Sequence, residues 1–178
     1  MAGPFGLEMG MKTTDFKNIR HCNFDVENIF PELYTVPIVP RPHPMMAEYT
    51  CEIAPQNGLF GIYCTSKDIH CGPKGSALKQ AFNKLKSQLE LKYGKKHIDI
   101  NRIDNGSPWH KPNDFMMSLC EADRSLVTIW MGALPDNLQF IMLYASAKTL
   151  DTGHVSIKYS FNNFNQAVYE LSNVNNPL

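Results

Sequence analysis

Three predicted strands follow one another in the second half of the chain, the last with clean alternation of apolar and polar residues, and only short turn-rich links separate them. They cover residues 125–132, 138–148 and 154–161. The first link contains Pro135 and Asn137, and the second ends in Asp151-Thr152-Gly153. Strands joined by such short links must be antiparallel, because a parallel crossover needs roughly a dozen or more residues. This pattern predicts a three-strand antiparallel meander.

A second pair of apolar segments meets at Asn57-Gly58, inside the stretch CEIAPQNGLFGIYC. Asn-Gly is typical of a two-residue type I′ turn, because both residues tolerate a positive φ. That turn predicts a hairpin in which Cys51 lies opposite Cys64 at a non-hydrogen-bonded position, where side chains approach most closely. The geometry permits a disulfide in an oxidising compartment. Two packed thiols are the alternative, since free cysteine is often buried.

Residues 76–93 carry one apolar stripe with helical spacing, between a Ser76 that suits an N-cap and a Gly94 that suits a C-terminal stop. The stripe consists of Leu78, Phe82, Leu85, Leu89 and Tyr93. Shorter helices are expected near residues 113–121 and 163–172. With helices and strands segregated, the sequence predicts an α+β fold. It would have a single antiparallel sheet, formed by the hairpin and the meander, which the long helix covers.

The composition is typical of a globular protein, with 178 residues, 43% hydrophobic and 19% charged. One domain over residues 1–178 is therefore expected. The 17 basic and 17 acidic residues balance, which gives no reason to expect a nucleic-acid partner. No apolar run approaches the roughly 20 residues that a membrane-spanning helix needs.

Lysines are concentrated between residues 74 and 96, where Glu90 is the only acidic residue. A solvated helix face is the usual meaning of such a pattern. The sharper interpretation is a surface for an acidic protein partner, with Lys79 and Lys86 as candidate binding residues. The segment GSPWHKPNDF adds Trp109 and His110 as candidates, because prolines stiffen the loop and tryptophan is a frequent binding anchor. The alternative is that Trp109 folds back onto the core.

No motif in the chain specifies catalysis, a metal or a cofactor. The five cysteines form no C-x-x-C pair, and no G-x-S-x-G motif occurs. The glycine-rich run at residues 70–80 lacks P-loop spacing, and residues 99–106 lack the ligands of an EF-hand. We therefore expect no catalytic residue, no bound metal and no cofactor. The alternatives are a small hydrolase or thiol enzyme built from Cys71, His70 or His110 and an acid, and a carrier of small apolar ligands.

Several segments together resemble small exported bacterial proteins of uncharacterised function. They are PFGLEMGM at residues 4–11, GLFGIYC at 58–64, LKQAFNKLKSQLELKYGKK at 78–96, Trp109, and MMSLCEADR at 116–124. The resemblance implies an envelope or periplasmic location, but no catalytic residue. The start of the chain shows no signal peptide as written, so a cytoplasmic protein is the alternative. We expect a non-catalytic protein-binding protein of the bacterial envelope, of the immunity or inhibitor type.

Overall fold

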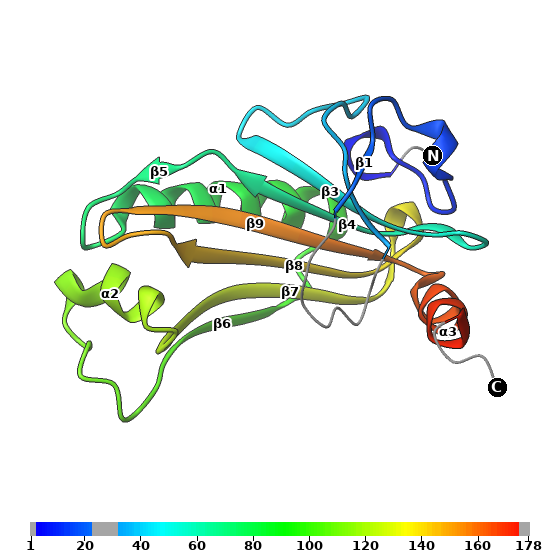
Figure 1. The fold of residues 1–178 in the computed structure, drawn as a ribbon. Helices are drawn as coiled ribbons and strands as arrows, with labels where there is room; N and C mark the ends of the chain where they lie inside the picture. Colours follow the sequence, from blue (N-terminus) through cyan, green and yellow to red (C-terminus); the bar gives the residue numbers. More distant parts are fainter. Residues whose placement is uncertain (1–2, 23–31, 175–178) are drawn as a thin grey trace. The chain divides into compact units, whose positions relative to one another are not determined.

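The computed structural model describes residues 3–22 and 32–174, which form an antiparallel sheet and three α-helices (Figure 1). The strands are β1 Arg20–His21, β2 Leu33–Thr35, β3 Met46–Ala54, β4 Gly58–Ser66, β5 Ile69–His70, β6 Ile98–Ile103, β7 Arg124–Leu134, β8 Leu138–Ala147 and β9 Thr152–Phe161. The helices are α1 Ser76–Tyr93, α2 Phe115–Cys120 and α3 Phe164–Val174. The predicted α+β class is confirmed.

The sheet is larger than a hairpin plus a three-strand meander, and this part of the prediction is wrong. Its strand order is β1-β2-β3-β4-β9-β8-β7-β6, and β5 pairs with β9. The expected hairpin strands are β3 and β4, and the expected meander strands are β7, β8 and β9. The four additional strands were missed because three of them are only two or three residues long. The fourth, β6, has the mixed sequence IDINRI.

The chain forms two compact units, which are best described separately. The first unit combines Met1–Cys64, Gly132–Phe140 and Lys158–Leu178. The second combines Thr65–Met131 and Ile141–Ile157, and contains α1, α2 and β6. The expectation of one domain over residues 1–178 stays a prediction.

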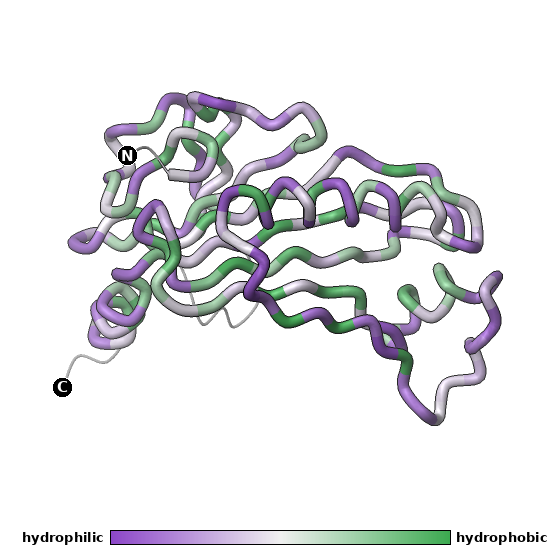
Figure 2. Tube along the Cα trace, turned by 180° about the vertical axis from the view of Figure 1, so that it is seen from behind, coloured by the Kyte–Doolittle hydropathy of each residue, from purple (hydrophilic) through white to green (hydrophobic). Residues whose placement is uncertain are grey.

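Helix α1 of the second unit begins and ends at the predicted residues. All five residues of its apolar stripe are buried, and the hydropathy along the helix alternates accordingly (Figure 2). Its N-cap is Gly75 rather than Ser76, with a φ of +63° that glycine adopts without strain. A Cβ at Gly75 would also lie 2.4 Å from the ring of Phe115. At the other end, the Gly94 N–H donates to the Glu90 carbonyl oxygen.

The hairpin loop of the first unit differs from the predicted type I′ turn. Strand β3 ends at Ala54 and β4 begins at Gly58, and Gly58 has a positive φ whereas Asn57 does not. A type I′ turn needs a positive φ at both central residues. The loop is instead fastened by α3, whose Glu170 carboxylate accepts hydrogen bonds from the backbone N–H groups of Gln56 and Asn57.

The longer loop changes which residues face each other across the hairpin. A Cβ built on Gly61 would lie 3.3 Å from the Cβ of Glu52, so these two residues are directly opposed. Counting from that pair places Cys51 opposite Ile62 instead of Cys64. Both cysteines are buried and no disulfide joins them in this structure, so the disulfide considered for Cys51 and Cys64 stays a prediction.

Candidate functional site

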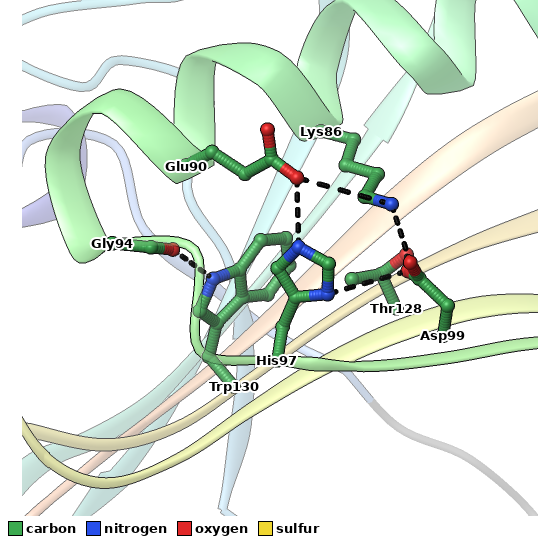
Figure 3. Close-up of polar contacts among 7 residues, drawn as sticks. All are labelled: Lys86, Glu90, Gly94, His97, Asp99, Thr128 and Trp130. Atoms are coloured by element: carbon green, nitrogen blue, oxygen red, sulfur yellow. Dashed lines mark hydrogen bonds and ion pairs between the residues drawn. The ribbon is translucent and has the colours of Figure 1, made fainter.

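A cluster of polar side chains lies between α1 and the strands β6 and β7 of the second unit. Figure 3 shows how Lys86 and Glu90 of α1 point toward His97 and Asp99, while Thr128 and Trp130 reach the same place from β7. The helix supplies the first two because Lys86 and Glu90 are four residues apart and share one face. We call these six residues the α1–β6 polar cluster.

His97 occupies the centre of the cluster. Its Nε2 is 2.7 Å from Glu90 Oε1, and its Nδ1 is 3.5 Å from Asp99 Oδ1. At the longer distance Nδ1 makes no hydrogen bond, so its contact with Asp99 is electrostatic only. The imidazole also meets the indole of Trp130 edge to face, with ring centroids 5.2 Å apart. The imidazole of His97 is therefore positioned by Glu90, Asp99 and Trp130 together.

Asp99 connects the helix to both strands. Lys86 Nζ donates to its Oδ2 at 2.6 Å, and Thr128 Oγ1 donates to its Oδ1 at 2.7 Å. Burial raises the pKa of Asp99, but the hydrogen bonds from Lys86 and Thr128 outweigh that effect and hold the pKa below its usual value. The carboxylate therefore stays ionised at neutral pH.

The geometry of the cluster does not match a hydrolytic triad. The Thr128 hydroxyl is bonded to the carboxylate of Asp99, whereas a nucleophile would have to reach the imidazole. The His97 nitrogen that would serve as the base, Nε2, is already paired with Glu90. Among the residues described, no group of three or more histidines, cysteines or acids is placed to hold a metal ion. The arrangement fits a structural role, which is to fasten α1 onto β6 and β7.

The two lysines predicted as binding residues both contact their own chain. Lys86 belongs to the α1–β6 polar cluster. Lys79 places its Nζ 4.0 Å from the ring centroid of Phe115, and burial together with the charge of Arg124 lowers the pKa of Lys79. The lysines of this region with exposed side chains are others, including Lys84, Lys95 and Lys96.

The predicted binding loop lies between β6 and α2. Trp109 is half-buried, and its backbone N–H donates to Ser107 Oγ at 3.1 Å. His110 is exposed. A part in binding stays a prediction for both residues.

The residues of the alternative thiol enzyme are only partly brought together. Cys71 borders an open hollow of about 430 Å³, which Lys74, Ser76 and Asn113 also line. Burial and the nearby Asp151 raise the pKa of the Cys71 thiol, so the reactive thiolate is disfavoured. His70 is bonded through Nδ1 to Thr152 Oγ1, and neither His70 nor His110 lines the hollow. The hollow is too open to be the enclosed cavity that a ligand carrier needs.

An apolar surface lies on the opposite side of β6 and β7 from the polar cluster. Because Thr128 and Trp130 point toward α1, the residues that alternate with them point away from it. Strand pairing sets Ile98 opposite Ile129 and Ile100 opposite Val127. None of these side chains is fully buried, and Ile98 and Met131 are 51% and 60% exposed. We call Ile98, Ile100, Val127, Ile129 and Met131 the β6–β7 apolar surface.

A buried carboxylate stands out in the first unit. Glu52 is only 2% exposed, and its Oε2 has no hydrogen-bond donor among the described residues. Its other oxygen accepts a long hydrogen bond from the Tyr63 hydroxyl, at 3.3 Å. Burial raises the pKa of Glu52, against the opposing effects of Lys158 and Tyr63. In the sequence Glu52 alternates with the apolar Cys51 and Ile53, which is typical of a solvated strand face and gives no signal that this face is covered.

Sequence reasoning also missed most of the α1–β6 polar cluster. The four-residue spacing of Lys86 and Glu90 was the one usable signal. Nothing in the sequence indicated that His97 and Asp99 would pack beneath that helix turn. The short link from α1 to β6 places them there.

Comparison with known proteins gives no relative: no protein-family model matches the chain, and no curated protein or solved structure is significantly similar. Within residues 3–22 and 32–174, no helix is both long and apolar enough to cross a membrane.

Proposed function

We propose that this protein is a non-catalytic protein-binding protein that recognises its partner through the β6–β7 apolar surface. The observation that carries the proposal is the exposure of apolar residues in two directly paired strands. Exposed apolar residues scattered singly are ordinary, but a contiguous patch is typical of an interaction site. The rigid sheet beneath it lowers the entropy cost of binding.

The acidic character of a partner is a separate part of the proposal, because it rests on the outward face of α1, which lies on the other side of β6 and β7 from the apolar surface. Leu91 on the outward face of α1 is 90% exposed, and Lys84 and Lys95 lie seven residues before and four residues after it. Lys84 and Leu91 share one side of the helix, whereas Lys95 follows the end of α1 at Tyr93. The helix and the residues just beyond it therefore present exposed lysines together with one exposed leucine. Such a surface favours an acidic protein partner by electrostatic complementarity. An immunity or inhibitor protein is one class with these properties.

The test uses the apolar surface itself. The protein carrying a photo-cross-linking residue at position 125, beside the patch, is expressed in its native cells. Cross-linked proteins are then compared with those of an Ile98→Glu/Met131→Glu variant. We expect one protein to be enriched with the parent and lost with the double variant. Leu150→Glu is the matched control, because Leu150 is 48% exposed and lies outside β6 and β7. Equal cross-linking by parent and double variant would count against the proposal.

An envelope location is proposed on the resemblance described above, with the segment at residues 78–96 as its longest part. Cell fractionation of the native protein tests it. Recovery with cytoplasmic markers would contradict it.

A further inference from the structure

Strand β6 forms one end of the strand order, and Figure 1 shows it as the outermost strand beside β7. It pairs with β7 at every residue from Ile98 to Ile103, without a bulge or proline. Within residues 3–22 and 32–174 β7 is the only strand that pairs with β6, and a regular edge of this kind is a template for another strand. Figure 2 shows the same edge from the other side.

The backbone groups on the free edge can be identified. The Asp104 N–H donates to the Asp123 carbonyl oxygen at 2.8 Å, which makes that opposed pair hydrogen-bonded. Hydrogen-bonded and non-hydrogen-bonded pairs alternate in an antiparallel ladder. Residues 98, 100 and 102 therefore bond to β7, whereas the N–H and C=O groups of residues 99, 101 and 103 point to the free edge.

The edge is complementary to itself in one register. When two copies of β6 are placed antiparallel with Ile100 opposite the partner's Ile100, Asp99 lies opposite the partner's Asn101. Both are residues whose backbone groups point outward, as a hydrogen-bonded pair requires. Lys96 then lies opposite the partner's Asp104, and the symmetry repeats this ion pair on the other side. Both residues are exposed.

Shifting the strands by two residues in either direction removes this match. One shift sets Asp99 against the partner's Asp99. The other sets Arg102 against the partner's Ile100 and Asp104 against the partner's Ile98, so the ion pairs between Lys96 and Asp104 are lost. Like charges directly opposed destabilise a strand pair. The charges of β6 and its flanks thus select a single register.

We propose that the protein forms a symmetric dimer by antiparallel pairing of β6 with β6 of a second copy, centred on Ile100. The sheet then continues across the twofold axis, and the β6–β7 apolar surfaces of the two copies become adjacent. The dimer does not depend on the function proposed above, because it uses the strand edge and not the apolar face.

Sedimentation equilibrium over a concentration series provides the test. We expect a monomer–dimer equilibrium, and weakening of the dimer by about tenfold or more in Lys96→Asp and in Asp104→Lys. The combined variant K96D/D104K restores the ion pairs with reversed sign and should recover dimerisation to within about threefold. Lys84→Asp, with the same charge change on α1, should leave the equilibrium unchanged.

The backbone contribution is tested separately. Asn101→Pro removes one outward N–H without touching the bonds to β7, because proline is tolerated where the N–H faces away from the sheet. It should abolish the dimer, whereas Asn101→Ala should keep it while losing the same side-chain contact with Arg124. If Asn101→Pro fails to fold, the variants Lys96→Asp, Asp104→Lys and K96D/D104K still test whether the dimer forms in this register. A monomer at all concentrations, or a dimer indifferent to both charge reversals, would overturn the proposal.

Discussion

The indole of Trp130 in β7 donates its N–H to the carbonyl oxygen of Gly94, 2.8 Å away, and so ties the sheet to the residue that ends α1. Trp130 is fully buried, and Gly94 follows the last residue of the helix. One side chain therefore secures both the end of α1 and the start of the link to β6.

Replacement of Trp130 should destabilise the second unit. Trp130→Phe removes the hydrogen bond to Gly94 and leaves a cavity, and we expect a loss of about 2–4 kcal/mol in the free energy of unfolding. Urea unfolding followed by circular dichroism measures it. The matched control is Trp109→Phe, because Trp109 is only half-buried, and its loss should be below about 1 kcal/mol. Equal losses of unfolding free energy in Trp130→Phe and Trp109→Phe would show that the buried hydrogen bond from Trp130 to Gly94 does not stabilise the protein more than an ordinary tryptophan contact.

Asp99 should make the stability fall in acid. Its pKa is held below the usual value in the folded protein, so its contribution is present above the unfolded pKa and disappears as the pH falls through the folded one. Asp99→Asn should cost about 0.5–1 kcal/mol of unfolding free energy at pH 7, because the pair with Lys86 is partly exposed. Thermal melts from pH 7 to pH 2 should show parent and variant converging in acid. A difference in Tm between parent and Asp99→Asn that stays constant from pH 7 to pH 2 would contradict a stabilising role of the ionised Asp99.

Glu52 should have the opposite pH dependence. Its pKa is raised in the folded state, so its favourable contribution is present below the unfolded pKa and disappears as the pH rises through the folded value. Glu52→Gln is expected to stabilise the protein at pH 8 by about 1–2 kcal/mol, since no buried charge is then needed, and to have little effect near pH 4. Unfolding curves at the two pH values measure this. Destabilisation at pH 8 would mean that the ionised Glu52 is well paired.

Position 61 should require a glycine, because the side chain of Glu52 occupies the space that a Cβ at this position would need. A Cβ at position 61 would lie 1.8 Å from Glu52 Oε2, so Gly61→Ala should destabilise the protein by about 2–4 kcal/mol. The backbone of Gly61 has no positive φ, which leaves steric conflict as the cause. In a Glu52→Ala background the same substitution should cost less than half as much. A double-mutant cycle in urea gives the coupling energy, and additive effects would refute the explanation.

Regular elements with strong periodicity could be predicted from the sequence. The apolar stripe of residues 76–93 defined α1 at both ends, and the strands 125–132, 138–148 and 154–161 were placed within a few residues. These elements are decided by local pattern, because one face of each is buried. The shorter helices near residues 113–121 and 163–172 were also located, as α2 and α3.

Features that depend on distant segments could not be predicted. The loop after Ala54 is set partly by Glu170, which lies more than a hundred residues away, so the Asn57-Gly58 signal alone was misleading. Glu52 alternates with apolar neighbours as a residue on a solvated strand face does, yet it is buried in the folded protein. The α1–β6 polar cluster arises only when His97 and Asp99 pack beneath α1, and no spacing rule links them to Glu90.

The hydrogen bonds from the Asn57 backbone and side-chain amide to Glu170 join residues 113 positions apart. During synthesis on the ribosome, the hydrogen bonds that hold the tip of the β3–β4 hairpin therefore cannot form until residue 170 has emerged. Contacts of such long sequence separation form late, because much chain entropy must first be lost. The hairpin tip should thus be among the last parts of the molecule to become protease-resistant after translation.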